Sequence, residues 1–157
     1  MSNDLCSGNT AWDDGTRTLL VWNLNDGISV YRIDDGPPVL IAKLKVTISR
    51  NFPVQVTFGP NAHLAISGSD NGHVYTWDLR THKPLHVLQH CRGSEVAVQT
   101  VSVSNLNSMM DVIANQLQNL QFACAGYDRY LIASASSDPN KKEQTIVVWT
   151  SVWPIVF

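Results

Sequence analysis

The sequence contains little charge and no strong excess of either sign. Only 15% of its 157 residues are charged, and 11 Lys and Arg against 13 Asp and Glu give a net charge of −2. A nucleic-acid binder or a polybasic membrane binder needs a concentrated positive field, so this balance argues against both classes. Hydrophobic residues make up 44%, which is enough for a core and too much for a disordered chain. The length fits one domain.

Long apolar runs are also missing. No stretch of about 18 uncharged apolar residues occurs, so no complete transmembrane helix is expected. The first four residues lack the basic and apolar regions of a signal peptide, and we expect an intracellular protein, cytoplasmic or nuclear. The nearly uncharged run 146–157 is most simply a strand and the start of the next one. It would begin a membrane anchor only if the chain continued beyond Phe157 with further apolar residues.

Motifs of catalysis and metal binding are absent. The sequence has no Gly-x-Ser-x-Gly elbow, no His-Glu-x-x-His pair and no phosphate loop that opens a helix. The three cysteines, Cys6, Cys91 and Cys124, are too widely spaced for a zinc site and fit reduced thiols. We therefore expect a protein that is not an enzyme and uses no cofactor.

Histidines recur every four residues at His82, His86 and His90, a spacing that would indicate metal ligands on a helix. Pro84 interrupts this segment, and its apolar residues are typical of a strand. The favoured interpretation is therefore a set of solvent-facing histidines, with no metal.

An internal repeat organises the chain. The sequence has 17 valines, 9 isoleucines and 10 threonines, which favour strands. Segments 18–33 and 63–78 each consist of an apolar run, a turn and a second apolar run, and their turn glycines, Gly27 and Gly72, are 45 positions apart. Asn-Asp-Gly and Asp-Asn-Gly are typical of hairpin turns, because glycine adopts a positive φ without steric cost. A further strand is predicted after each hairpin, at 39–45 and 84–88, and another before the second, at 54–58.

A third copy is longer. Its predicted strands lie at 96–104, 130–137 and 145–149. Ser108 and Asp111 fit a helix-capping pattern, and apolar residues then recur at spacings of three and four. These features predict a helix at 108–121 within an insertion at 105–127, with its apolar side packed on its own domain.

The second copy resembles the WD-repeat family. The residues that carry the likeness are Phe58-Gly-Pro-Asn61, Leu64-Ala-Ile-Ser-Gly-Ser69 and the dipeptide Trp77-Asp78, and Val148-Trp149 repeats the pattern more weakly. The positions that correspond to the repeat signature are Ser67, Asn71, Gly72, Trp77, Asp78, Asp26, Gly27 and Trp149.

The resemblance implies an all-β fold: an incomplete WD-repeat-like β-propeller of about three four-stranded antiparallel blades, with one helical insertion near 108–121. We expect residues 1–157 to form a single partial propeller domain, with blade-like units at about 5–45, 54–88 and 96–157. Closed propellers have four to eight blades. Three blades leave open edges, which favours a truncated propeller or one completed by self-association.

The family often carries a His–Asp–Ser–Trp hydrogen-bond network within a blade. In this chain Asn71 replaces the Asp of the second copy, and no Gly-His dipeptide precedes strand 54–58 or strand 96–104. We therefore expect the blades to be held mainly by apolar packing.

The function that the resemblance implies is a non-enzymatic scaffold that mediates protein–protein interaction. The candidate contacts for an unidentified protein partner are Arg80, His82 and Lys83 after the Trp-Asp strand, and Arg50 in a loop before a strand. Two alternatives stay open. Trp77-Asp78-Leu79-Arg80 matches a box with which some WD-repeat receptors dock a cullin-type ubiquitin ligase adaptor. The chain would otherwise be the N-terminal part of a membrane-anchored propeller protein.

Overall fold

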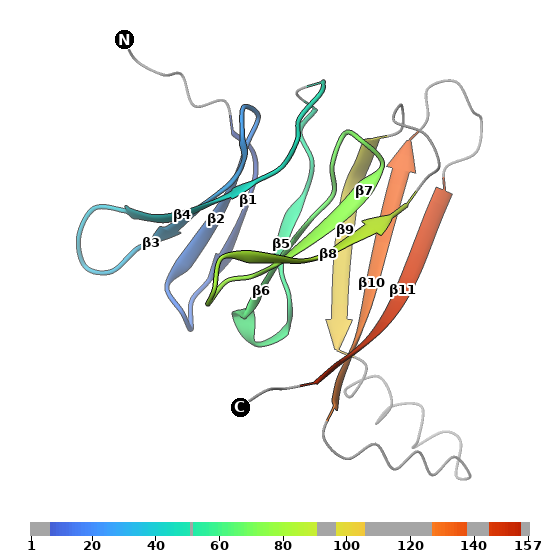
Figure 1. The fold of residues 1–157 in the computed structure, drawn as a ribbon. Coiled ribbons are helices and arrows are strands. Elements are labelled where there is room, and N and C mark those ends of the chain that lie inside the picture. Colours follow the sequence, from blue (N-terminus) through green and yellow to red (C-terminus); the bar gives the residue numbers. More distant parts are fainter. Residues whose placement is uncertain (1–6, 51, 91–96, 106–126, 138–144, 155–157) are drawn as a thin grey trace.

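The computed structural model describes residues 7–50, 52–90, 97–105, 127–137 and 145–154. These residues form an all-β fold of three antiparallel sheets (Figure 1). The sheets follow one another in chain order, from the first at the left in blue to the third at the right in yellow and red. The predicted helix at 108–121 lies outside the described residues.

The first sheet has four strands in the order β1-β2-β3-β4. Its strands are β1 (Ser7–Asp13), β2 (Thr18–Asn23), β3 (Gly27–Arg32) and β4 (Val39–Lys45). Gly27 begins β3 with a φ of 113°, and a Cβ there would lie 2.4 Å from the carbonyl oxygen of Leu44. The predicted hairpin is therefore confirmed, and its glycine is required by both backbone angle and space.

The second sheet repeats this arrangement in the order β5-β6-β7-β8. Its strands are β5 (Val56–Phe58), β6 (Leu64–Ser67), β7 (His73–Asp78) and β8 (Lys83–Gln89), and a 3-10 turn, Pro60–Ala62, joins β5 to β6. Gly72 has a φ of 80°, as its predicted turn requires. The first two of the three predicted four-stranded units are therefore confirmed as sheets.

Within the described residues, the third sheet contains three strands in the order β11-β10-β9, where we expected four. They are β9 (Ala97–Asn105), β10 (Tyr127–Ser137) and β11 (Thr145–Pro154). The interpretation of the terminal run as two strands is wrong within the described residues, because β11 continues unbroken to Pro154. The reason is that β10 begins at Tyr127, earlier than predicted, and pairs with β11 up to that proline.

The sheets pack face to face through two separate apolar clusters. Trp22 and Ile28 of the first sheet meet Val56 and Trp77 of the second in one cluster. In the other, Ile66 and Val74 of the second sheet meet Val98, Val101 and Ile132 of the third. All of these side chains are at most 2% exposed. The second sheet is thus buried on both faces, which places the core on either side of it.

The first strands of the three sheets adjoin one another. The amide of Val56 donates to Asn9 Oδ1 at 3.1 Å, which links the β5 and β1 strands. The amide of Gln55, directly before β5, donates to the carbonyl of Gln99 on β9 at 2.8 Å. Near the turn after β6, a Cβ on Gly68 would lie 2.0 Å from the Val98 carbonyl oxygen, so only glycine allows this approach. Hydrogen bonds and close contacts therefore link the three sheets along the edges that their first strands form.

A buried histidine joins the second sheet to the third. His90 directly follows β8 and is 7% exposed. Its Nδ1 is hydrogen-bonded to Ser134 Oγ, and its Nε2 lies 3.0 Å from Ser136 Oγ. Its ring centroid is 5.9 Å from that of Trp149. The expectation of a solvent-facing His90 is wrong, and a polar contact supplements the apolar packing that we expected.

We predict that His90→Ala lowers the free energy of unfolding by about 2 kcal/mol, because two buried hydroxyls lose a shared partner. The matched control is His82→Ala, since His82 is exposed on the turn between β7 and β8 and its removal should cost less than about 0.5 kcal/mol. Urea unfolding followed by tryptophan fluorescence measures both values. Equal values for the two variants would contradict the role of His90.

Candidate interaction surfaces

The turn between β7 and β8 holds three of the four candidate contact residues. Asp78 ends β7 with 9% exposure, and its Oδ1 accepts hydrogen bonds from the Arg80 amide at 2.8 Å and from Arg80 Nε at 3.4 Å. The Arg80 side chain remains 62% exposed. His82, with a φ of 57°, is exposed on the same turn, and Lys83 is exposed where the turn ends and β8 begins. The structure therefore gathers a small basic surface around Arg80.

Arg50 is not part of this turn, and its backbone has a structural contact. The amides of Ser49 and Arg50 both donate to Asp70 Oδ2. Asp70 is only 3% exposed, and its second oxygen, Oδ1, is buried and has no hydrogen-bond partner among the described residues. Asp70 was not among the predicted residues. Its place in a Ser-Asp-Asn-Gly turn had indicated only a hairpin, because the loop that it holds is about 20 positions distant in the sequence.

The signature residues of the second sheet form local contacts. Ser67 is buried and its hydroxyl donates to the Gly68 carbonyl at 2.9 Å. Asn71 accepts a hydrogen bond from the Ser69 hydroxyl, and its Nδ2 donates to the Tyr75 hydroxyl at 2.9 Å. Tyr75 in turn stacks on Trp77, with ring centroids 5.6 Å apart. These residues stabilise the turn and strand, so they are structural.

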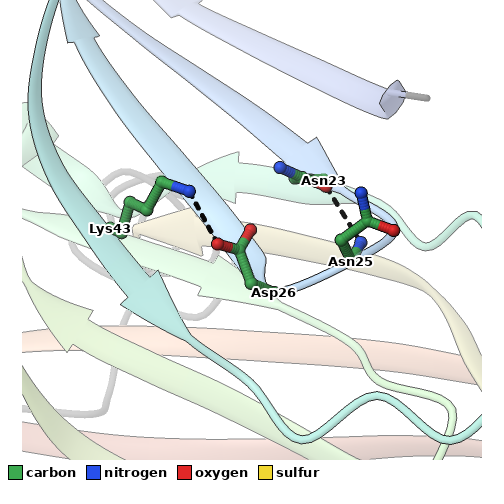
Figure 2. Close-up of polar contacts among 4 residues, drawn as sticks. All are labelled: Asn23, Asn25, Asp26 and Lys43. Carbon is green, nitrogen blue, oxygen red and sulfur yellow. Dashed lines mark hydrogen bonds and ion pairs between the residues drawn. The ribbon is translucent and has the colours of Figure 1, made fainter. Parts of the chain in front are cut away.

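The signature acid of the first sheet also has a neighbouring partner. Lys43 Nζ on β4 lies 2.7 Å from Asp26 Oδ2, and the amide of Asn25 donates to Asn23 Oδ1 at 2.9 Å (Figure 2). The hydrogen bond and the charge of Asp26 raise the pKa of Lys43. Both side chains are more than a third exposed. The pair therefore forms a polar border on the first sheet.

The last strands of the first two sheets, β4 and β8, are edge strands, and we call them the outer strands. They expose apolar side chains at equivalent positions. Each strand has one residue without a cross-strand partner: Ile41 between Leu40 and Ala42, and Leu85 between Pro84 and His86. These two bulged residues are 41% and 39% exposed. The other exposed aliphatic side chains are Val39 and Leu40 on β4 and Val87 on β8. The sequence signal for these exposed side chains is an apolar run such as Val39-Leu40-Ile41. The run does not alternate apolar and polar residues, and by itself it predicts only a strand.

Within the described ranges, no group of three or more His, Cys, Asp and Glu residues is placed to hold a metal ion. The described part of the chain contains no helix that is long and apolar enough to cross a bilayer.

No protein-family model matches the sequence, and no curated protein matches it either.

We predict that Asp78→Asn removes an acid-dependent part of the stability. Burial raises the pKa of Asp78, but hydrogen bonds from the Arg80 amide and guanidinium and from the Thr81 amide outweigh it, so the pKa lies below the ordinary 3.8. The stabilisation is therefore fully present above pH 3.8 and is lost as the pH falls through the lower folded-state pKa.

The measurement is urea unfolding of both proteins between pH 2 and pH 7, a range that extends to either side of the ordinary pKa of 3.8. We expect the wild type to exceed the variant by about 1 kcal/mol above pH 5, and the gap to close in acid. A gap that is constant over the whole range would contradict the assignment.

Proposed function

We propose that this chain is a non-enzymatic scaffold of the WD-repeat type, an incomplete β-propeller that binds proteins through its exposed sheet surfaces. The observation that carries the proposal is the pair of outer strands, β4 and β8, which present aliphatic side chains to solvent at matching bulges. Such exposed apolar groups on a folded domain are typical of protein-binding surfaces.

The propeller architecture is supported by an aromatic residue that recurs on the third strand of each sheet. Tyr31 and Trp77 are each the last residue but one of the third strand in their sheets, and each directly follows the register shift that produces the bulge. Trp149 lies on the third strand of the last sheet and pairs with the second strand at Ile132, as Tyr31 pairs with Leu19 and Trp77 with Ala65. A fixed aromatic position in successive antiparallel sheets is typical of propeller blades.

The mode of binding follows from the chemistry of the outer strands. Addition of a partner strand is disfavoured, because bulges, Pro84 and the lysines of β4 and β8 interrupt the edges. The partner is therefore expected to contact side chains. Rigid sheets hold these side chains in place, so little conformational entropy is lost on binding. The basic turn at Arg80 provides an adjoining polar contact on the same sheet.

We predict that the double variant Leu85→Lys, Val87→Lys loses at least tenfold of the bound partner, because two charges replace the apolar contact. The immobilised full chain is exposed to cell extract, and the retained proteins are quantified by mass spectrometry. Thr47→Lys, an exposed charge outside the outer strands, is the matched control and should retain the wild-type set. Retention no greater than on an unrelated β-sheet protein would overturn the proposal.

A second candidate function is a substrate receptor of a ubiquitin ligase. The observation in its favour is Arg80, whose guanidinium is oriented by Asp78 yet mostly exposed. We predict that Arg80→Ala weakens binding of a purified cullin-type adaptor at least tenfold, while the exposed Arg32→Ala has little effect. Isothermal titration measures the affinities. Absence of adaptor binding by the wild type would remove this candidate.

A further inference from the structure

One face of the first sheet is covered by no other described sheet. Cross-strand partners share a face, so Trp12, Leu19, Tyr31 and Leu40 form a row across all four strands. Their neighbours Leu20 and Val30 lie on the opposite face and are buried against the second sheet. Trp12 and Leu40 are both 46% exposed. We call this row, with Thr10 and Val21 beside it, the open aromatic face.

The second sheet has a corresponding aromatic face, and there it is buried. Trp77 pairs with Ala65, as Tyr31 pairs with Leu19, and these two residues of the second sheet are 2% and 0% exposed. They pack in the cluster shared with the first sheet. The aromatic face of the second sheet therefore covers the face of the first sheet that holds Leu20 and Val30. We call this opposite face the back of a sheet.

The third sheet follows the same rule. Ile132, the partner of Trp149, is 2% exposed and packs with Ile66 and Val74 of the second sheet. The direction of packing is thus the same at both contacts: the aromatic face of one sheet lies on the back of the sheet before it. Only the first sheet's aromatic face lacks such a neighbour among the described residues.

The back of the third sheet offers the complementary surface. Ala133 pairs with Ser102, and Ala135 pairs with Thr100, so these four small residues share the face opposite Ile132. Ser102 and Thr100 are exposed, and the two alanines are half-buried. Small side chains leave room for the large, partly exposed ring of Trp12. The ion pair of Lys43 and Asp26 borders the open aromatic face, as polar groups border protein interfaces.

We infer that a second copy of this chain covers the open aromatic face with the back of its third sheet. Resting on the proposed propeller fold, this contact repeats for a third time the packing that the chain already makes twice. It is a contact between two different surfaces, so the pair retains one free surface of each kind: the back of the third sheet on one copy and the open aromatic face on the other. Two copies joined reciprocally through both surfaces close a ring of six sheets, within the four to eight of closed propellers.

The first measurement is sedimentation equilibrium of the full chain. The expected mass is twice the 17.4 kDa of one chain, with no larger species. Trp12→Lys places a charge in the contact, and Ser102→Arg does the same on the other surface. Each variant alone should dissociate at least tenfold more readily, and circular dichroism verifies that both remain folded. The control, Leu85→Lys with Val87→Lys, alters an outer strand and should leave the mass unchanged.

Mixing the two variants tests which surfaces meet. A mixed pair of Trp12→Lys and Ser102→Arg regains one intact contact, so the mixture should associate more tightly than either variant alone. If the aromatic face bound its own counterpart, Ser102→Arg would stay paired, and this outcome would overturn the inference. A wild-type monomer, or a mass that grows steadily with concentration, would also overturn it.

The proposed scaffold function fails separately. A monomer that still retains protein partners through Leu85 and Val87 would leave the scaffold proposal standing without the paired ring. A dimer that retains no partner would contradict the scaffold proposal and leave the ring.

Discussion

Burial of one sheet face against the back of the preceding sheet is the constraint on which this structure depends. A four-stranded antiparallel sheet cannot bury both of its faces alone, so its stability comes from its neighbours. The second sheet has a neighbour on each side, and both Trp77 and Val74 are almost fully buried there. The aromatic position of the first sheet, Tyr31, has the same place in the strand order but remains half-exposed. Position in the stack, more than the residue itself, thus decides whether this aromatic group stabilises the core.

The polar contact of His90 adds orientation to this apolar packing. Ser134 and Ser136 are buried, and burying a hydroxyl is unfavourable unless it finds a hydrogen-bond partner. The imidazole provides one for both, and it extends from the end of the second sheet to the middle strand of the third. Because hydrogen bonds require a specific geometry, the contact disfavours other registers between the two sheets, whereas apolar side chains tolerate small shifts.

Local signals predicted the two hairpins, and nonlocal contacts account for what was missed. The turns at Gly27 and Gly72 depend on backbone angles that short sequences encode, so they were predictable. The burial of His90 depends on serines more than 40 positions away, which no local pattern indicates. Arg80, His82 and Lys83 lie close together because they are near one another in the sequence, and their role as partner contacts stays a prediction. The hydrogen bond from the Arg50 amide to Asp70 joins two segments that are distant in the sequence, so no local turn signal predicts it.

The edges of the sheets are protected against association, whereas the open aromatic face is not. The outer edges have bulges at Ile41 and Leu85, lysines on both strands and a proline in β8, all of which oppose pairing with a further strand. The aromatic face of the first sheet has no such protection: its central row is apolar, and its charges lie at the border in the pair of Lys43 and Asp26. A surface that excludes strand addition but exposes an apolar face favours partners that approach as a packed layer. The stacking of sheets within the chain is the geometry that such a partner would extend.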